Sequence, residues 1–146
     1  MKFHTLASLT FGLFAVAGSA QSYSQTYRVK IASVNNGPVY TEVYEYDYVD
    51  VKPEFPGGSN SFISYINNNR HYPTDAYEMG IQGRVTCAFI VHPDGKLSHI
   101  QILRGVENSL NEEAVRLVSS MPDWKPGKIN DIPVPVRVVC CIPFRR

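Results

Sequence analysis

The sequence lacks the patterns that identify common catalytic sites. Its 146 residues contain no G-x-S-x-G, H-E-x-x-H, C-x-x-C or P-loop motif. The histidines beyond residue 20 are His71, His92 and His99, and they are placed on a predicted loop, turn and strand without the i, i+4 spacing of a helical metal site. Because no residue set supplies a nucleophile with a base, we expect neither an enzyme nor a bound metal or cofactor.

The sequence also has no excess of charge of either sign. It carries 14 basic and 13 acidic residues, and charged residues make up 18% of the chain. Partners such as nucleic acid are attracted by a basic surface, which this composition does not predict. We therefore expect no nucleic-acid partner, and no motif indicates a small-molecule substrate.

Near the N-terminus there is an apolar run, but it is short for a membrane span. Residues 6–20 number 15 and include Ser8, Thr10 and Ser19, whereas a spanning helix needs about 20 apolar residues. Lys2 before the run and Gly18-Ser19-Ala20 at its end are typical of a signal peptide, residues 1–20, cleaved before Gln21. An uncleaved membrane anchor is the alternative, and it would keep the protein at the inner membrane.

The sequence is poor in cysteine. Cys87, Cys140 and Cys141 all fall in predicted strands, and an odd number with two adjacent members is an unfavourable disulfide framework. Cysteine is also common as a small buried apolar residue. A Cys87–Cys140 bridge in an oxidising compartment therefore stays an open alternative to free thiols.

What the sequence does contain is one well-patterned unit, residues 83–121. Apolar residues alternate from Val85 to Val91, His92-Pro93-Asp94-Gly95 predicts a type I turn, and a returning strand follows. Ser109 and Glu112 fit a capping box that begins a helix, and Pro122 ends it. Its apolar stripe is Leu110, Ala114, Leu117, Val118 and Met121.

The flanking residues complete a small domain, residues 53–146. Ser59 predicts the cap of a short helix, Thr74 caps a helical turn closed by Gly80, and a last strand runs from Val134 to Ile142. The expected fold is an α+β two-layer sandwich, with a three-stranded antiparallel sheet in the order 2-1-3 and two helices on the face of Val85, Phe89 and Val138. The last strand is then an edge, which suits the missing N–H groups of Pro133 and Pro135.

Residues 21–52 precede this domain as an N-terminal segment. Tyr27–Val34 and Val39–Val49 have strand patterns around the turn signal Asn35-Asn36-Gly37-Pro38, so a β-hairpin is predicted that either docks on the domain or stays mobile. Acidic residues gather here, either as an interaction arm or, as we favour, as a solvated face: Glu42, Glu45, Asp47, Asp50 and Glu54.

A series of motifs in residues 50–144 adds a family resemblance. In order, they are Tyr72-Pro73, Ala76, Gly80-Ile81-Gln82-Gly83-Arg84-Val85, Asp94-Gly95-Lys96, Arg104-Gly105-Val106, Leu110, Glu113-Ala114, Met121-Pro122, Trp124 and Pro126-Gly127-Lys128. Together they resemble the C-terminal domain of TonB-type energy transducers. The opening residues 53–58, PEFPGG, are similar to the version found in Bacteroidetes-like members.

The resemblance implies a periplasmic binding module for TonB-dependent outer-membrane receptors. In that family the last strand receives a short receptor segment, the TonB box, as an added strand, and this β-augmentation supports energy-coupled nutrient transport. Carried onto this chain, it implies one partner-binding surface, the predicted edge strand: Val134, Val136, Arg137, Val138, Val139 and Cys140.

The chain departs from a full transducer in ways that leave a second hypothesis open. A full transducer has an N-terminal transmembrane helix and a long linker, and this chain has neither if its signal is cleaved. The alternative is a structural or interaction domain that forms a homodimer through the edge strand, or binds other envelope proteins, without energy transduction. A homodimer would use the last strand, as receptor binding would, whereas binding to other envelope proteins would use the acidic hairpin.

Overall fold

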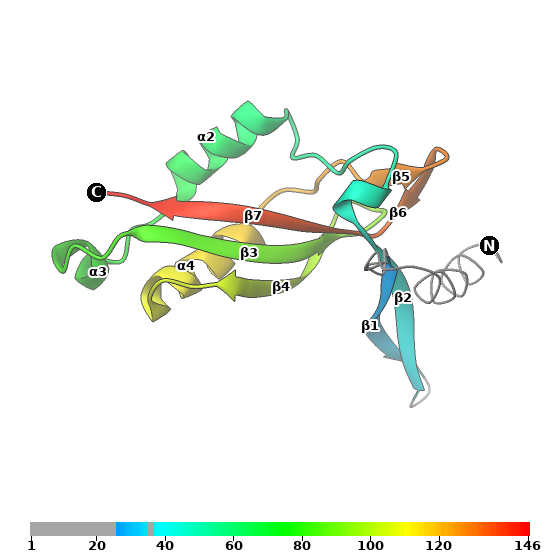
Figure 1. The fold of residues 1–146 in the computed structure, drawn as a ribbon, viewed down its shortest axis with the longest axis horizontal. Helices are drawn as coiled ribbons and strands as arrows, with labels where there is room; N and C mark the ends of the chain where they lie inside the picture. Colours follow the sequence, from blue (N-terminus) through cyan, green and yellow to red (C-terminus); the bar gives the residue numbers. More distant parts are fainter. Residues whose placement is uncertain (1–25, 35–36) are drawn as a thin grey trace, which may run out of the picture.

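The computed structural model describes residues 26–34 and 37–146 (Figure 1). The predicted signal peptide, the polar residues up to 25 and Asn35-Asn36 of the predicted turn lie outside the described residues. No helix in the described part is long and apolar enough to cross a membrane. The elements are β1 (Thr26–Val34), β2 (Gly37–Glu45), η1 (Tyr46–Tyr48), α2 (Ser59–Asn69), α3 (Thr74–Glu78), β3 (Gly83–Val91), β4 (Leu97–Arg104), α4 (Asn108–Ser119), β5 (Gly127–Ile129), β6 (Ile132–Val134) and β7 (Val136–Phe144).

The main sheet has five strands in the order β1-β2-β7-β3-β4. The predicted order of the three central strands is confirmed, because β3 pairs antiparallel with β4 on one side and with β7 on the other. The prediction of only three strands is wrong, since β2 joins β7 through two parallel pairs, Tyr44 with Val136 and Glu45 with Arg137. The physical reason is burial: Val43 and Tyr44 are covered only when the end of β2 lies against the sheet.

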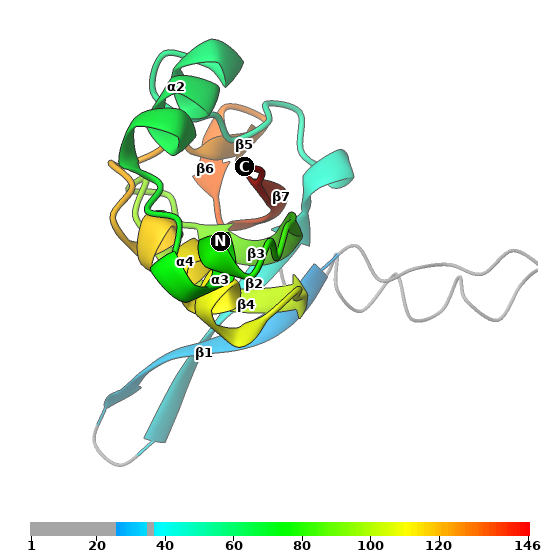
Figure 2. The ribbon, with the colours of Figure 1, turned by 90° about the vertical axis from the view of Figure 1, so that its left-hand side faces the viewer.

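Helices cover one face of this sheet, as Figures 1 and 2 show. Side chains of β3 and β7 that point to this face form one core with Ile66 of α2 and with Leu110 and Leu117 of α4. The predicted packing of Val85, Phe89 and Val138 against two helices is therefore confirmed. The helical turn predicted from Thr74 is a third helix, α3, which buries Ala76 in the same core.

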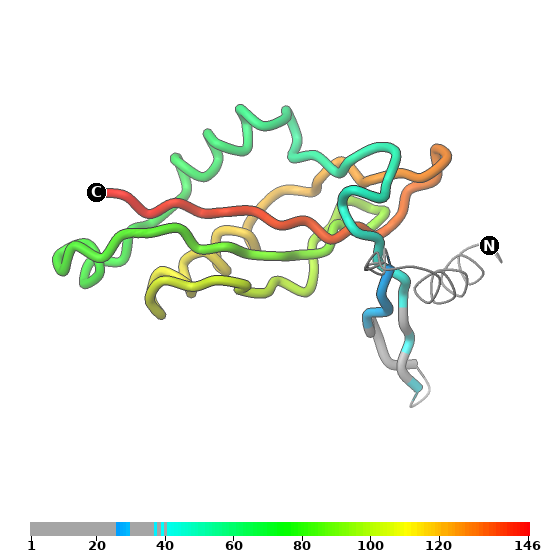
Figure 3. Tube along the Cα trace, viewed as in Figure 1, coloured from blue at the N-terminus to red at the C-terminus, as the bar shows by residue number. Residues whose placement is uncertain are grey.

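The N-terminal hairpin docks on the opposite face. Tyr27 and Val29 of β1 line a small cavity of about 150 Å³ together with Ala88 and Ile90 of β3. Ala88 and Ile90 point away from the helices, yet each is only 2% exposed. In the Cα trace of Figure 3, the chain passes from the end of β2 into η1. Of the two alternatives for the hairpin, the structure has the docked one.

The turn and the C-cap predicted from sequence are confirmed, but the N-caps differ. Gly95 has φ +86 and donates to His92, and Gly80 has φ +70 after α3. The cap of α4 is not Ser109, because the carboxylate of Glu107 accepts hydrogen bonds from both the Ser109 backbone N–H and its hydroxyl. Ser59 and Thr74 are likewise the first residues inside their helices, after Gly58 and Pro73.

Candidate functional site

On the side away from β3, strand β7 is paired at its start and unpaired beyond it within the described residues. Over its first two residues it pairs with β2, and the Tyr44 N–H donates to the Pro135 carbonyl at 2.9 Å. After Glu45 the chain turns away from the sheet into η1. From Val138 onward, no strand in the described part of the chain pairs with this side of β7 (Figure 1).

The direction of the backbone groups follows from two observed contacts. In an antiparallel ladder, alternate residues direct both their N–H and C=O groups to the same neighbour. The Pro135 carbonyl faces β2, and the Pro143 carbonyl accepts from Arg70 Nη1 at 2.5 Å, so odd-numbered residues of β7 face away from β3. The N–H and C=O groups of Val139 and Cys141 are therefore turned outward, and among the described residues they have no partner. We call Val138–Cys141 the free edge.

A strand that pairs with the free edge cannot extend its pairing beyond either end. At its start, β2 occupies the outer side of Arg137. At its far end, Pro143 has no N–H, and its carbonyl is already bound by Arg70. An incoming strand can therefore form about four backbone hydrogen bonds, two with Val139 and two with Cys141.

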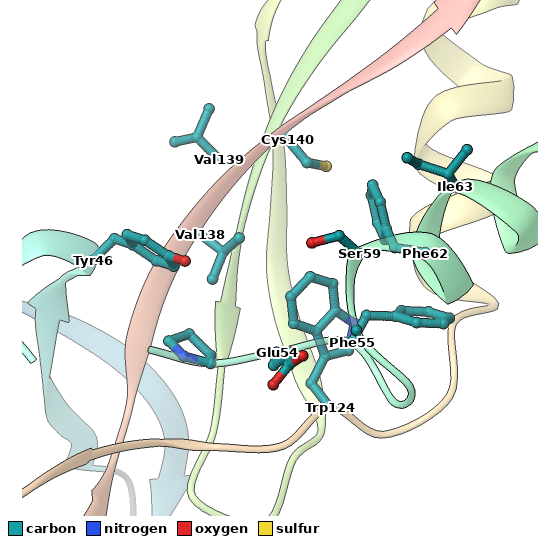
Figure 4. A pocket seen from close by; sticks show the side chains of 12 residues that line it. Tyr46, Glu54, Phe55, Ser59, Phe62, Ile63, Trp124, Val138, Val139 and Cys140 are labelled. Carbon is teal, nitrogen blue, oxygen red and sulfur yellow. The ribbon is translucent and has the colours of Figure 1, made fainter. Parts of the chain in front are cut away.

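An open cavity of about 340 Å³ lies beside the free edge (Figure 4). Val138, Val139 and Cys140 form its β7 wall, and Phe62 and Ile63 of α2 lie across from them. The remaining wall includes Tyr46, Phe55 and Trp124. This lining is largely apolar, so the cavity suits a large apolar side chain of a segment bound at the edge.

The floor of the cavity is fixed by aromatic packing. Trp124 is only 8% exposed and meets the rings of Phe55, Phe62 and Phe89 at centroid distances of 5.8, 5.9 and 5.2 Å. These are edge-on contacts, which aromatic pairs favour. The Trp124 indole Nε1 is buried and has no hydrogen-bond partner among the described residues. Trp124 is part of the main hydrophobic core.

The structure separates the six residues predicted to bind a partner. Val134 belongs to β6 and pairs with Gly127, because Pro135 has no N–H and interrupts the strand after it. Val136 is fully buried, and Arg137 is paired with β2, with its guanidinium 3.9 Å from the Glu45 carboxylate. Val138, Val139 and Cys140 lie on the free edge, and Val139 is 48% exposed.

The residues predicted from the sequence to bind a partner did not include Cys141. Cys141 supplies half of the outward backbone groups, but the predicted site stopped one residue earlier. The alternation of apolar residues continues to Phe144, where β7 ends, and this was the available signal. Arg70 lies far away in the sequence, so no local pattern places it at the Pro143 carbonyl.

The surroundings of Cys140 do not activate its thiol. Cys87 and Cys140 are directly opposite each other on β3 and β7, and all three cysteines are free thiols in the structure. The hydrogen bond shared with Cys87, together with burial, raises the pKa of Cys140 well above its ordinary value. Cys140 is therefore a neutral thiol in the wall of the cavity, and not an activated nucleophile.

Two of the acidic residues singled out in the sequence, Asp50 and Glu54, contact the segment that follows α4. The Asp50 carboxylate accepts from the Asn130 N–H at 2.7 Å, and the Glu54 backbone bridges to Lys125. Across residues 26–34 and 37–146, no group of histidine, cysteine, aspartate and glutamate could hold a metal ion. The chemistry that this site offers is backbone pairing beside an apolar cavity.

Comparison with known proteins gives a family match. The model of the family described as Gram-negative bacterial TonB protein C-terminal matches residues 68–145. Residues 53–58 precede this match, and none of the comparisons identifies the Bacteroidetes-type subgroup.

Solved structures and curated proteins were also compared. The chain is similar to two NMR solution structures of the Helicobacter pylori TonB C-terminal domain. The first is 23% identical, covers 62% of this chain and 86% of that chain, and has a TM-score of 0.45. The second is 21% identical, covers 58% and 89%, and has a TM-score of 0.46. No curated protein matches the chain.

Proposed function

Because the chain belongs to the family of Gram-negative bacterial TonB C-terminal domains, we propose that it is a periplasmic module that binds TonB-dependent outer-membrane receptors. Domains of this family are in general periplasmic, non-enzymatic interaction domains that engage outer-membrane receptors. In the proposal, a receptor segment of the TonB-box type adds to β7 as a further strand at the free edge. The bound module then supports energy-coupled nutrient transport.

One observation carries this proposal: the outward N–H and C=O groups of Val139 and Cys141 beside the apolar cavity. Unpaired edge groups are a template for another chain, and their hydrogen bonds supply affinity in β-augmentation. Selectivity then comes from pockets for alternate side chains, and the cavity walled by Val138 and Cys140 is such a pocket. A strand bound here satisfies backbone groups that otherwise bond only to water.

The proposed location rests on the predicted signal peptide, residues 1–20. Its cleavage before Gln21 would release the domain into the periplasm, and its retention would hold the domain at the inner membrane. N-terminal sequencing of the protein from the periplasmic extract and from the membrane fraction distinguishes the two. A first residue of Gln21 supports the free module, whereas Met1 in the membrane fraction contradicts it.

The binding proposal is tested by titrating a synthetic TonB-box peptide into the ¹⁵N-labelled protein. We expect the amide resonances of Val138–Cys141 to move with the largest amplitude, because new backbone bonds form there. Helix α3 is an internal control, since it lies away from the free edge. Unchanged resonances at Val138–Cys141 with about 1 mM peptide, a concentration that detects even weak binding, would contradict the proposal.

Self-association is the second candidate, because the same free edge and the exposed Val139 could pair with another copy of the chain. Sedimentation of the peptide-free protein decides between the two. A monomer that binds peptide supports the receptor role. A dimer that dissociates when Val139→Lys is introduced, and that shows no peptide shifts, supports the alternative.

A further inference from the structure

Cys87 of β3 and Cys140 of β7 are direct cross-strand partners. The register between the two strands runs without a shift along the whole of β3, and these two cysteines lie opposite each other in it. Even-numbered residues of β7 turn their N–H and C=O groups toward β3, so this is a hydrogen-bonded pair. The Cα atoms of such a pair are about 5.5 Å apart, which lies inside the range that disulfide bonds span.

The two thiol groups also point to the same side of the sheet and meet there. Both side chains belong to the face that packs on the helices, where Cys87 is fully buried and Cys140 is partly buried. The two thiols share a hydrogen bond, so their sulfur atoms are already in contact in the reduced protein. Because the strands are at a suitable spacing, rotation of the side chains can close an S–S bond without moving the backbone.

The third cysteine is separated from this pair by the sheet itself. Successive side chains of a strand alternate between its two faces, and Figure 4 shows this alternation for Val139 and Cys140. Cys141 therefore points to the other face, where its sulfur lies 3.5 Å from the Thr86 hydroxyl. Two cysteines whose side chains point apart cannot be bridged without a shift of the backbone. The three cysteines thus divide into one matched pair and one exposed thiol.

We propose that Cys87 and Cys140 are joined by a disulfide bond in the exported protein, and that this bond fastens β7 to β3. The inference rests on the proposed periplasmic location, because disulfides form and persist in oxidising compartments. The bond forms during folding, before Cys87 is buried, by thiol–disulfide exchange with an oxidant that carries a disulfide. Two protein thiols become one S–S bond, and their two hydrogen atoms, with the electrons, convert the disulfide of the oxidant to two thiols.

The position of this bond has a mechanical consequence at the free edge. Cys140 lies between Val139 and Cys141, whose outward backbone groups are proposed to receive the receptor segment. Force applied through an added strand acts on β7, and without the bond only packing and the hydrogen bonds to β3 resist it. A covalent bond in the middle of the free edge holds β7 to β3 under that load.

Thiol labelling of the protein from a periplasmic extract tests the bond directly. Cells are lysed in N-ethylmaleimide, which blocks free thiols, and the protein is digested with trypsin without reduction. We expect Cys141 to be the labelled cysteine and the peptides Val85–Lys96 and Val138–Arg145 to be joined until a reductant is added. A chain that begins at Gln21 and carries the label on all three cysteines would overturn the inference.

Refolding separates the pairing of the thiols from the location of the protein. The purified protein is reduced, unfolded in urea and returned to a buffer of reduced and oxidised glutathione. We expect the Cys87–Cys140 bond to exceed any bond to Cys141 by about tenfold, because Cys141 points to the other face. The Cys141→Ser variant is the matched control and should form the same bond. Refolded protein without this bond overturns the inference, whereas a bond in refolded protein combined with Met1 in the membrane fraction contradicts only the location.

The bond should also change the stability of the fold. It closes a loop of about 50 residues, and such a cross-link constrains the unfolded chain. The oxidised protein should unfold about 10 °C above the same protein in reductant. In the Cys140→Ala variant, which cannot form the bond, the reductant should leave the unfolding temperature unchanged. Equal unfolding temperatures of the oxidised and reduced unaltered protein would contradict the fastening of β7 to β3.

Amide exchange locates this stabilisation on β7. Ile142 is paired with Val85 of β3, so its amide should exchange at least about tenfold more slowly after oxidation. The amide of Val139 points outward in both forms and should keep its rate. Slowing at Val139 and not at Ile142 would contradict a bond that acts between β7 and β3.

Discussion

The side of β7 that faces away from β3 has two parts. Val136 and Arg137 are paired with β2, whereas Val138–Cys141 are unpaired among the described residues. Val136 and Arg137 are covered by β2, with the Tyr44 N–H on the Pro135 carbonyl and Glu45 beside Arg137. Val138–Cys141 continues the same strand, but its outward groups meet solvent beside the cavity. The difference comes from where the hairpin leaves the sheet, because β2 turns away after Glu45.

This contrast shows how a chain can restrict an exposed strand edge to a short recognition site. A long free edge is an aggregation hazard, and proteins shorten or cover such edges. Here β2 covers one end of β7, and Pro143 with Arg70 closes the other. The remaining free edge is long enough for a few backbone bonds, so its partner needs pocket contacts as well.

The largest expected effect comes from placing proline at two adjacent positions of β7. Val138→Pro should lower the free energy of unfolding by about 3 kcal/mol, because it removes a ladder bond to β3 and a buried side chain. Val139→Pro should cost less than about 1 kcal/mol, since its N–H points outward, but it should abolish peptide binding. Urea unfolding measures the stability of each variant, and the peptide titration measures its binding. Equal destabilisation by the two prolines would show that the N–H of Val139 is not free.

Removing the Tyr44 side chain, which packs β2 against the start of β7, should have the next largest effect on stability. Tyr44 is 3% exposed and stacks on Tyr48 at 5.7 Å, so Tyr44→Ala should cost about 3 kcal/mol. It should also speed hydrogen exchange at Arg137, which would then resemble Val139. Tyr77→Ala is the control, because Tyr77 is exposed and should cost less than about 1 kcal/mol. Unchanged exchange at Arg137 would mean that β2 does not protect this half.

The contact between β2 and β7 should weaken at alkaline pH. Burial, with smaller contributions from Glu42 and Tyr48, raises the pKa of Tyr44 above its ordinary value of 10.0. A raised pKa favours the neutral phenol in the fold, so this stabilisation is present below pH 10 and is lost as pH rises through the folded pKa. Tyr44→Phe should therefore lose less stability above pH 10 than the unaltered protein, as followed by circular dichroism. An identical alkaline loss in both proteins would contradict this role.

The smallest effect on stability is expected from the ion pair between Arg137 and Glu45. Its two side chains are partly exposed and their charged atoms are 3.9 Å apart, so Glu45→Gln should change the free energy of unfolding by less than about 0.5 kcal/mol. Thermal unfolding at low and high salt measures it. A loss of more than about 1 kcal/mol would mean that charge, and not the burial of Tyr44, holds β2 against β7.

The parts of the fold built from local signals could be predicted from the sequence. Alternation and the His92–Gly95 turn specify β3 and β4, and the apolar stripe specifies α4, because each depends on neighbouring residues. The order of the three central strands followed from the hairpin of β3 and β4 and from the return of the chain through α4. The cap of α4 was predicted two residues too late, at Ser109 instead of Glu107, because a glutamate side chain can also accept from the first backbone N–H groups of a helix.

The extent of the candidate site could not be predicted in this way. The parallel contact of β2 with β7 joins residues about 90 positions apart and depends on the docking of a whole hairpin. The same is true of Arg70 at the Pro143 carbonyl and of the cavity between Phe62 and Val138. Sequence patterns therefore located the strand that carries the site, but tertiary contacts decide which of its residues are open.

Hydrogen exchange at single amides of β7 tests the central claim most directly. In the free protein, we expect Val139 and Cys141 to exchange quickly while Arg137, Val138 and Cys140 are protected. With a TonB-box peptide bound, the exchange of Val139 and Cys141 should slow to a rate near that of Arg137. Protection of Val139 and Cys141 before any peptide is added, or no slowing at saturation, would contradict the account.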